Sequence, residues 1–188
     1  MRVIAGEAKG RTLVAPKGTG TRPATDRIRE TLFAILEPEL GDSRVLDLFA
    51  GAGTMGIEAL SRGAAHVTFV ERSAEALDAL RRNVKATGFV DRAEVVSANV
   101  IGFLDRGVPG EKSDFAFLDP PFADVAILEA TIAHPNLAAA LTPDATVVAR
   151  VHKKHQPRVP EGARVHRVKD IGEESLLFLR YDGGRGGG

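Results

Sequence analysis

The fold is decided by residues 45–60, VLDLFAGAGTMGIEAL, in which an apolar run leads into a glycine-rich loop and then into a helical pattern. The loop places Gly51, Gly53 and Gly56 in the spacing GxGxxG, after a predicted strand and at the start of a predicted helix. Glu71 follows Gly51 by 20 residues, at the end of the next apolar run. A carboxylate at that position binds ribose hydroxyls. The segment therefore predicts a βαβ unit that binds an adenosine-containing cofactor.

Short apolar runs alternate with helical segments along the rest of the chain. This alternation predicts a doubly wound, mainly parallel sheet of the α/β, Rossmann-like class. Two final runs, residues 164–171 and 175–181, are joined by GEE without a helix, so we expect an antiparallel hairpin at one edge of the sheet. The parallel strands are predicted at residues 44–50, 66–71, 93–98, 114–119 and 146–151, and the helices between them at 55–63, 73–88 and 125–134.

The N-terminal segment has an excess of basic residues, although the formal net charge of the chain is zero. Residues 1–30 hold seven Lys or Arg against three acids, a surplus of four. A basic end on a neutral protein suggests a local contact with a polyanion. We expect a basic hairpin or arm over residues 1–22, one domain over residues 23–182 and a disordered tail, GGRGGG, over residues 183–188.

A helix is predicted from residue 26, with Thr25 or Asp26 as N-cap and Pro38 closing the segment. The 188 residues include no cysteine, which excludes disulfides, thiolate metal sites and a cysteine nucleophile. His152 and His155 form an HxxH with two lysines between them and no third ligand, so we expect no metal site. No apolar stretch is long enough to cross a membrane. We expect a cytoplasmic monomer.

The segment DFAFLDPPF, residues 114–122, places Asp119 at the end of a strand and follows it with Pro120, Pro121 and Phe122. The prolines fix φ and lack N–H donors, so the loop is stiff and presents acceptors. The Asp119 carboxylate and a carbonyl such as that of Pro120 can accept from an exocyclic amine and stabilise the positive charge that develops as its nitrogen attacks. Phe122 offers a ring on which a flipped-out base can stack.

The glycine loop and DPPF both follow strands of one predicted sheet. In such sheets the ligand crevice opens at the carboxyl ends of the strands, so we expect the two motifs to flank one crevice. A nicotinamide dinucleotide is the usual ligand of GxGxxG. S-adenosyl-L-methionine also fits, because Asp47, close to the loop, suits an ammonium group and DPPF suits methyl transfer to an amine. Transfer to carbon 5 of a pyrimidine is excluded, because it needs a cysteine.

Four segments in this order carry a family resemblance: residues 2–13, 22–33, 45–64 and 118–122, which read RVIAGEAKGRTL, RPATDRIRETLF, VLDLFAGAGTMGIEALSRGA and LDPPF. Together they resemble the RsmD family of bacterial 16S rRNA guanine-N2 methyltransferases. The resemblance implies S-adenosyl-L-methionine as methyl donor. It also implies a guanine in 16S rRNA of the small ribosomal subunit as acceptor, of the guanine-966 type.

The resemblance also implies roles for individual residues. Asn99 stands where many such enzymes have an aspartate facing the adenine amino group, and its amide oxygen can still accept. Thr25 lies in a segment that approaches the methionine end of the cofactor. The implied cofactor residues are Asp47, Phe49, Gly51, Gly53, Gly56, Glu71, Asn99 and Thr25. The implied catalytic residues are Asp119, Pro120, Pro121 and Phe122, and the implied RNA-binding residues are Arg2, Lys9, Arg11 and Arg22.

Three other functions share part of this pattern. An N6-adenine DNA methyltransferase also uses DPPF, but such enzymes carry a target-recognition domain for which this chain has no spare length. A protein-glutamine methyltransferase shares the chemistry and needs no basic arm. A noncatalytic RNA-binding module would keep the arm and could lose DPPF, which is intact here.

Overall fold

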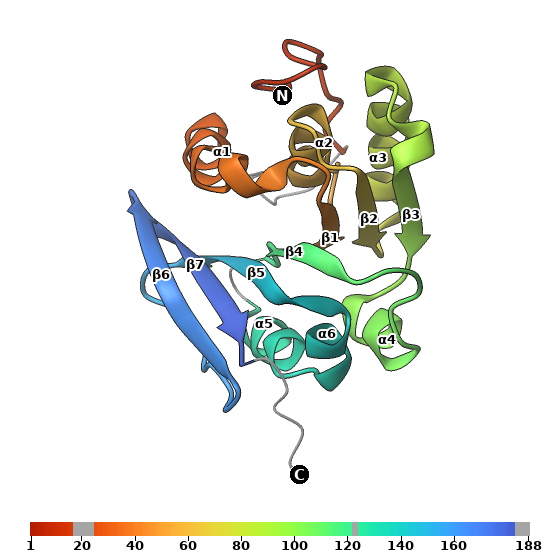
Figure 1. Ribbon diagram of the computed structural model, residues 1–188. Coiled ribbons are helices and arrows are strands. Elements are labelled where there is room, and N and C mark those ends of the chain that lie inside the picture. Colours follow the sequence, from red (N-terminus) through yellow and green to blue (C-terminus); the bar gives the residue numbers. More distant parts are fainter. Residues whose placement is uncertain (17–24, 122–123, 183–188) are drawn as a thin grey trace. The chain divides into compact units, whose positions relative to one another are not determined.

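The computed structural model describes residues 1–16, 25–121 and 124–182. The chain forms two compact units, Met1–Val100 and Ile101–Gly188, which Figure 1 shows in the colours of the sequence. The predicted division of the chain at residues 22 and 182 stays a prediction.

The first unit contains a parallel sheet in the order β3-β2-β1. Its registers pair Leu48 with Val70 and Glu71 with Ser97, so the carboxyl ends of the three strands lie at one edge of the sheet. Its interior is apolar, and Phe69 and Leu48 are fully buried. The elements are β1 (Arg44–Leu48), α2 (Thr54–Ser61), β2 (His66–Glu71), α3 (Ala74–Thr87), the 3-10 helix η1 (Val90–Arg92) and β3 (Ala93–Ser97).

Helix α1 (Asp26–Leu40) precedes this sheet, and Thr25 is its N-cap, with Oγ1 accepting from the Ile28 amide. The prediction that Pro38 closes the helix is wrong, because Pro38 lies inside it. A proline inside a helix costs about 3 kcal/mol through its missing N–H and its clash with the preceding turn. Burial of Leu36 and Leu40, on either side of Pro38, offsets part of this cost.

The N-terminal arm, residues 1–16, is a small looped segment in which Arg2 and Thr12 form an antiparallel bridge. The Val3 amide donates to the Arg11 carbonyl, and the Gly10 amide donates to the Val3 carbonyl. Val3 and Leu13 are buried. The described part of the arm is thus held by a single antiparallel bridge, and the predicted hairpin or arm over residues 1–22 stays a prediction.

The second unit holds four strands in the order β4-β5-β7-β6. β4 and β5 are parallel, whereas β7 is antiparallel to both β5 and β6. The predicted antiparallel hairpin at the edge is confirmed. The elements are α4 (Val100–Asp105), β4 (Ser113–Leu118), α5 (Val125–Ile132), α6 (Pro135–Ala139), β5 (Leu141–His152), β6 (Ala163–Ile171) and β7 (Glu174–Tyr181).

The predicted class, α/β with a mainly parallel sheet, is confirmed. Two α-helices, α4 and α6, and the 3-10 helix η1 were not predicted, because six, five and three residues show too little periodicity to predict a helix. β5 begins at Leu141, earlier than predicted, because Pro143 and Asp144 interrupt the apolar pattern. Within the described ranges no helix is long and apolar enough to cross a membrane.

Candidate active site

The glycine loop begins with a sharp change of backbone direction after β1. The amides of Phe49 and Ala50 both donate to the Val70 carbonyl, at 3.2 and 3.0 Å, so the strand ends against β2. Phe49 has φ 101°, a conformation that a bulky residue rarely adopts and that often marks a functional constraint. The Gly53 amide then donates to the Ala50 carbonyl at 2.7 Å and closes a tight turn.

The three glycines of GxGxxG are required for different reasons. A Cβ at Gly53 would lie 2.3 Å from Leu80 Cδ1, and one at Gly56 would lie 2.3 Å from Phe69 Cε1. These two glycines thus allow close packing inside the protein. Gly51 has φ 55°, and a Cβ there would meet no described residue within 4 Å. Of the three, Gly51 is the position where backbone opens onto free space that a ligand can approach.

The Glu71 carboxylate is held by three main-chain donors. Its Oε2 accepts from the Gly51 amide, and its Oε1 accepts from the amides of Arg72 and Ser73, each at 2.8 Å. An ionised carboxylate offers about four acceptor positions. The contacts with described residues therefore leave about one acceptor position, and Glu71 is fixed to the glycine loop.

Asp47 is only 2% exposed, and its Oδ2 accepts from the Gly56 amide at 3.0 Å. It therefore satisfies a free amide in the first turn of α2. Its interpretation as the partner of an ammonium group stays a prediction.

Asn99 is exposed just beyond β3, next to Ala98, whose amide donates to the Glu71 carbonyl at 3.0 Å. The structure thus brings the segments that follow β1, β2 and β3 to one edge of the first unit. Thr25 lies in the same unit as the N-cap of α1.

Asp119 lies at the end of β4 in the second unit and is bound by an arginine that the sequence analysis overlooked. Arg150 Nη1 donates to both Asp119 oxygens, at 3.1 and 3.0 Å. The same guanidinium donates to Glu174 through Nε at 2.6 Å and through Nη2 at 3.2 Å. Arg150, on β5, therefore bridges the candidate catalytic acid to an acid at the start of β7.

The ionisation of Asp119 is set by opposing effects. Burial raises the pKa of Asp119 above its ordinary value, and the positive charge and hydrogen bonds of Arg150 oppose that rise. Burial would lower the pKa of Arg150, but the hydrogen bonds and charges of Glu174 and Asp119 raise it overall. Arg150 thus stays protonated and holds Asp119 in one orientation, while each carboxylate oxygen keeps acceptor capacity for another donor.

The two prolines after Asp119 differ in what their carbonyls do. The Pro121 carbonyl accepts from the Asp124 amide at 2.9 Å, just before α5. Pro120 is buried, and no hydrogen bond to its carbonyl is found among the described residues. Of the two proline carbonyls, we therefore expect that of Pro120 to act as the second acceptor beside Asp119. Phe122 lies outside the described residues, as does Arg22 of the predicted RNA-binding set.

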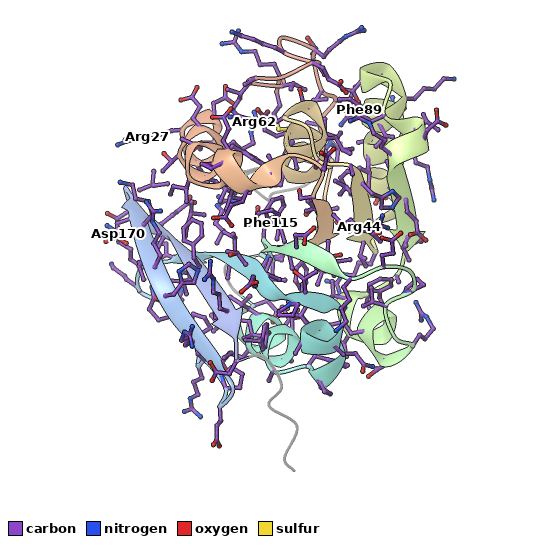
Figure 2. All side chains as sticks on the ribbon, viewed as in Figure 1. Arg27, Arg44, Arg62, Phe89, Phe115 and Asp170 are labelled. Atoms are coloured by element: carbon purple, nitrogen blue, oxygen red, sulfur yellow. The ribbon has the colours of Figure 1, made fainter. Side chains whose placement is uncertain are left out.

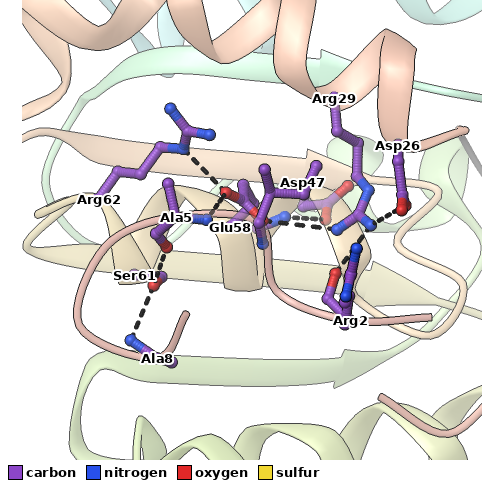
Figure 3. A network of polar contacts seen from close by, with 11 residues as sticks. Arg2, Ala5, Ala8, Asp26, Arg29, Asp47, Glu58, Ser61 and Arg62 are labelled. Atoms are coloured by element: carbon purple, nitrogen blue, oxygen red, sulfur yellow. Dashed lines mark hydrogen bonds and ion pairs between the residues drawn. The ribbon is translucent and has the colours of Figure 1, made fainter. Parts of the chain in front are cut away.

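The N-terminal arm is attached to α2 through Glu58 and Ser61 (Figure 3). Glu58 is fully buried and accepts from the amides of Ile4 and Ala5 at 2.8 and 3.0 Å. Ser61 Oγ accepts from the Ala8 amide at 3.0 Å and donates to the Ala5 carbonyl at 2.6 Å. The backbone of the arm is thereby fixed on one helix.

Arg29 completes this attachment from α1, with no exposed surface of its own. Its Nη2 donates to the Arg2 carbonyl at 2.8 Å and to Asp26 at 2.7 Å, and its Nη1 lies 3.5 Å from Glu58 (Figure 3). The side chains of Arg2, Lys9 and Arg11 are left exposed, and no ion pair engages them within the described ranges. A fixed backbone therefore presents three basic side chains to solvent.

The residues that hold these parts in place were not predicted from the sequence. Glu58 and Arg29 belong to helices whose apolar stripes dominated the pattern, and Arg150 lies within the apolar run of β5. The sequence did contain a signal, namely a charged residue within an apolar strand or helix. Such a residue indicates a buried partner of opposite charge, since unpaired charges are almost never fully buried.

The fold is the Rossmann-like fold of methyltransferases, as comparisons with solved structures confirm. The structure of yhhF from Escherichia coli matches with TM-score 0.82 at 35% identity, over 97% of this chain and 98% of that one. An RNA methyltransferase from Salinibacter ruber, solved with S-adenosyl-L-homocysteine, matches with TM-score 0.64 at 15% identity, over 86% and 94% of the two chains, and so shares the fold.

The family follows from the sequence comparisons. The family model described as "Conserved hypothetical protein 95" matches residues 1–180. Ribosomal RNA small subunit methyltransferase D of Escherichia coli strain K12 is 38% identical over 184 residues, which cover 97% of this chain and 90% of the relative. The chain therefore belongs to the RsmD family of ribosomal RNA small subunit methyltransferases, and the resemblance drawn from its motifs is confirmed.

Proposed function

We propose that this protein transfers a methyl group from S-adenosyl-L-methionine to the exocyclic N2 of a guanine in 16S rRNA of the small ribosomal subunit. The observation that carries the proposal is Asp119, an acid at the end of a buried strand, oriented by Arg150 and followed by two prolines. The membership of the RsmD family supports the choice of small-subunit rRNA over DNA or protein. We further propose that the protein acts as a cytoplasmic monomer.

The residues of the first unit fit the adenosine-containing donor. Gly51 offers backbone beside open space, and Glu71 keeps one acceptor position for a ribose hydroxyl. Asn99 is exposed at the same edge and can accept from an amino group. S-adenosyl-L-methionine supplies an electrophilic methyl group on a sulfonium when it is bound. We assign cofactor binding to these residues, together with Asp47, Phe49, Gly53, Gly56 and Thr25.

The residues of the second unit fit the acceptor amine. The lone pair of an exocyclic amine on a base is delocalised into the ring, so the nitrogen is a weak nucleophile and its proton is too weakly acidic for a carboxylate to remove first. Asp119 and the Pro120 carbonyl accept from its two hydrogens and stabilise the charge that grows on nitrogen during attack. Arg150 opposes the rise that burial causes in the pKa of Asp119 and orients its carboxylate. We assign stacking of the base to Phe122.

The N-terminal arm fits a contact with RNA, because Arg2, Lys9 and Arg11 extend from a backbone that Glu58 and Ser61 hold fixed. A backbone that is already fixed loses less conformational entropy when its side chains bind phosphates than a flexible backbone does. We also assign Arg22 to this RNA contact, because it matches the basic arm of the RsmD family.

The test offers labelled cofactor to small ribosomal subunits lacking the modification, to free 16S rRNA and to DNA, and then identifies the methylated nucleoside after digestion. The proposal predicts N2-methylguanosine from small-subunit rRNA. Label in N6-methyladenine from DNA would identify the alternative, an adenine methyltransferase, and label in protein alone would exclude rRNA as substrate.

A further inference from the structure

A second concentration of positive charge lies in the second unit, on β6 and the connection that leads into it. Residues 153–169 contain six Lys or Arg and a single acid, Glu161. All six basic residues are exposed. We call this set the β6 basic surface: Lys153, Lys154, Arg158, Arg164, Arg167 and Lys169.

The strand itself is unusually open. β6 is the edge strand of the second unit, and every residue from Arg164 to Asp170 is exposed. Figure 1 shows β6 with β7 on one side only, and Figure 2 shows side chains projecting from it along its length to Asp170. Val165 and Val168, at 37% and 53% exposure, add apolar area between the cations.

The strand register places the basic side chains on one face. Arg164, Arg167 and Lys169 lie opposite Arg180, Phe178 and Leu176, which alternate along β7 and so share a face of the sheet. The Arg167 guanidinium lies 5.7 Å from the centre of the Phe178 ring, in agreement with this register. The charges therefore form a row along the strand.

The same register relates the row to the candidate catalytic acid. Arg150 also lies opposite Leu176, on the other side of β7 from Lys169. Two strand spacings separate the Cα atoms of Arg150 and Lys169, which is roughly 10 Å. Since Arg150 binds Asp119, the row and Asp119 belong to one continuous region of the second unit.

Most of these cations have no acidic partner among the residues that the structure describes. Lys153 lies 3.4 Å from Asp170, and Arg164 lies 2.8 Å from Asp182. Both ion pairs are exposed and therefore weak. Lys154, Arg158, Arg167 and Lys169 form no ion pair with any described residue. At least four positive charges are thus available to a ligand.

We propose that the β6 basic surface is a second RNA-binding surface, which holds phosphates of the rRNA that supplies the target guanine. This inference rests on the proposed function, which it extends from the arm to the second unit. Six cations with one acid in 17 residues match a polyanion. Protection of an edge strand against pairing needs only one or two charges of either sign. The same row would repel a second copy of the chain approaching this edge.

The experiment measures binding of 16S rRNA transcript and of small ribosomal subunits as a function of salt. The test variant carries Arg164→Gln, Arg167→Gln and Lys169→Gln. The matched control carries Arg81→Gln, Arg106→Gln and Lys112→Gln, three exposed basic residues elsewhere that lose the same charge. Each phosphate contact contributes about 0.7–0.9 to the slope of log affinity against log salt concentration. We expect the slope of the test variant to fall by about 2 and that of the control to stay close to the wild type.

A second variant, with Lys153→Gln, Lys154→Gln and Arg158→Gln, alters the connection without touching the pairing of β6 and β7. The slope of log affinity against log salt concentration should also be smaller for this variant. If the first variant is less stable than the wild type, the slope of the second variant alone tests the proposal. Slopes equal to the control in both variants would overturn the proposal. The proposal would also be overturned if sedimentation showed that the wild type is a dimer and the Arg164, Arg167 and Lys169 variant is a monomer. The β6 edge would then bind a second copy of the chain.

The nucleoside analysis of the same preparations separates this inference from the proposed function. If the wild type methylates guanine N2 in small subunits and both β6 variants behave as the control, the surface proposal fails and the function stands. If the slopes fall as expected but the label is found in another base, the guanine assignment fails and the surface stands.

Discussion

Replacement of Arg150 by methionine tests how Asp119 is held. Arg150 is 4% exposed and donates to both Asp119 and Glu174, whose side chains are 19% and 20% exposed. Removing one partner of a buried ion pair costs about 3–5 kcal/mol. The carboxylates keep some contact with water, so we expect the lower end, about 3 kcal/mol. For a chain of this length that loss corresponds to a midpoint of thermal unfolding lower by roughly 6–12 °C.

The same substitution should change the pH dependence of methyl transfer. Burial raises the pKa of Asp119, and Arg150 opposes the rise. Without Arg150 the pKa of Asp119 rises further, and the negative charge of Glu174 adds to that effect. Because the ionised carboxylate is the acceptor, activity falls as pH falls through this pKa. The acid limb of the profile of kcat against pH should therefore move to higher pH.

Asp119 affects the pH dependence of stability in the opposite direction from an acid whose pKa is lowered by folding. An acid whose pKa is raised by folding contributes stability below its unfolded pKa and loses it as pH rises through the folded pKa. The destabilisation by Arg150→Met should therefore be largest at neutral and alkaline pH, where Asp119 is ionised, and should shrink as Asp119 becomes protonated.

Two further variants complete this test. Arg82→Met removes an exposed arginine paired with Asp78, and it should shift the unfolding midpoint by no more than about 2 °C. Arg150→Lys keeps the charge but cannot bridge two carboxylates in the same way, so it should recover part of the pH profile. An acid limb that does not move in Arg150→Met, or a midpoint shift equal to that of Arg82→Met, would refute the assignment of Arg150 as a positioning residue.

Three other substitutions test the attachments of the loop and the arm. Gly6→Ala places a Cβ 1.7 Å from the Ser61 carbonyl oxygen at φ 81°, so the arm should detach, with weaker RNA binding and unchanged cofactor affinity by calorimetry. Glu58→Gln replaces an acceptor that binds several donors, and it should lower the free energy of unfolding by about 3 kcal/mol in urea and expose the arm to proteolysis. Gly56→Ala forces a Cβ against Phe69, and it should cost about 1–3 kcal/mol of stability and lower cofactor affinity.

Each of these predictions has an outcome that contradicts it. Full RNA affinity in Gly6→Ala would mean that the arm does not act in RNA binding. An arm in Glu58→Gln that is as resistant to proteases as in the wild type would remove Glu58 from its anchoring role. Cofactor affinity unchanged in Gly56→Ala would mean that the packing of α2 does not shape the loop.

The architecture was largely accessible from the sequence, because hydrophobic pattern sets the order of strands and helices. β2 has the predicted bounds, His66–Glu71, and Ser73 and Gly88 flank α3 as an N-cap and a terminal glycine should. Pro38 misled the prediction because tertiary burial of Leu40 outweighs the local preference of proline to end a helix.

The contacts between side chains could not be predicted from the sequence, because they depend on the register in which the strands pair. Asp119 was predicted as an acceptor, but Arg150 and Glu174 meet it only once β5 and β7 pair. The charge of β6 was hidden for another reason. Residues 31–188 are net acidic as a whole, so the basic stretch at residues 153–169 disappears in the average.

The central claim is that the first unit binds the methyl donor and Asp119 in the second unit supports the chemistry. It is tested most directly by measuring, in Asp119→Asn, the affinity for S-adenosyl-L-methionine and the single-turnover rate of methyl transfer to small ribosomal subunits. Arg150 keeps Glu174 as a partner in this variant, so the fold should persist. We expect cofactor affinity within about twofold of the wild type and a transfer rate lower by roughly 10²–10³-fold. A transfer rate close to that of the wild type, or loss of cofactor binding together with activity, would contradict the account.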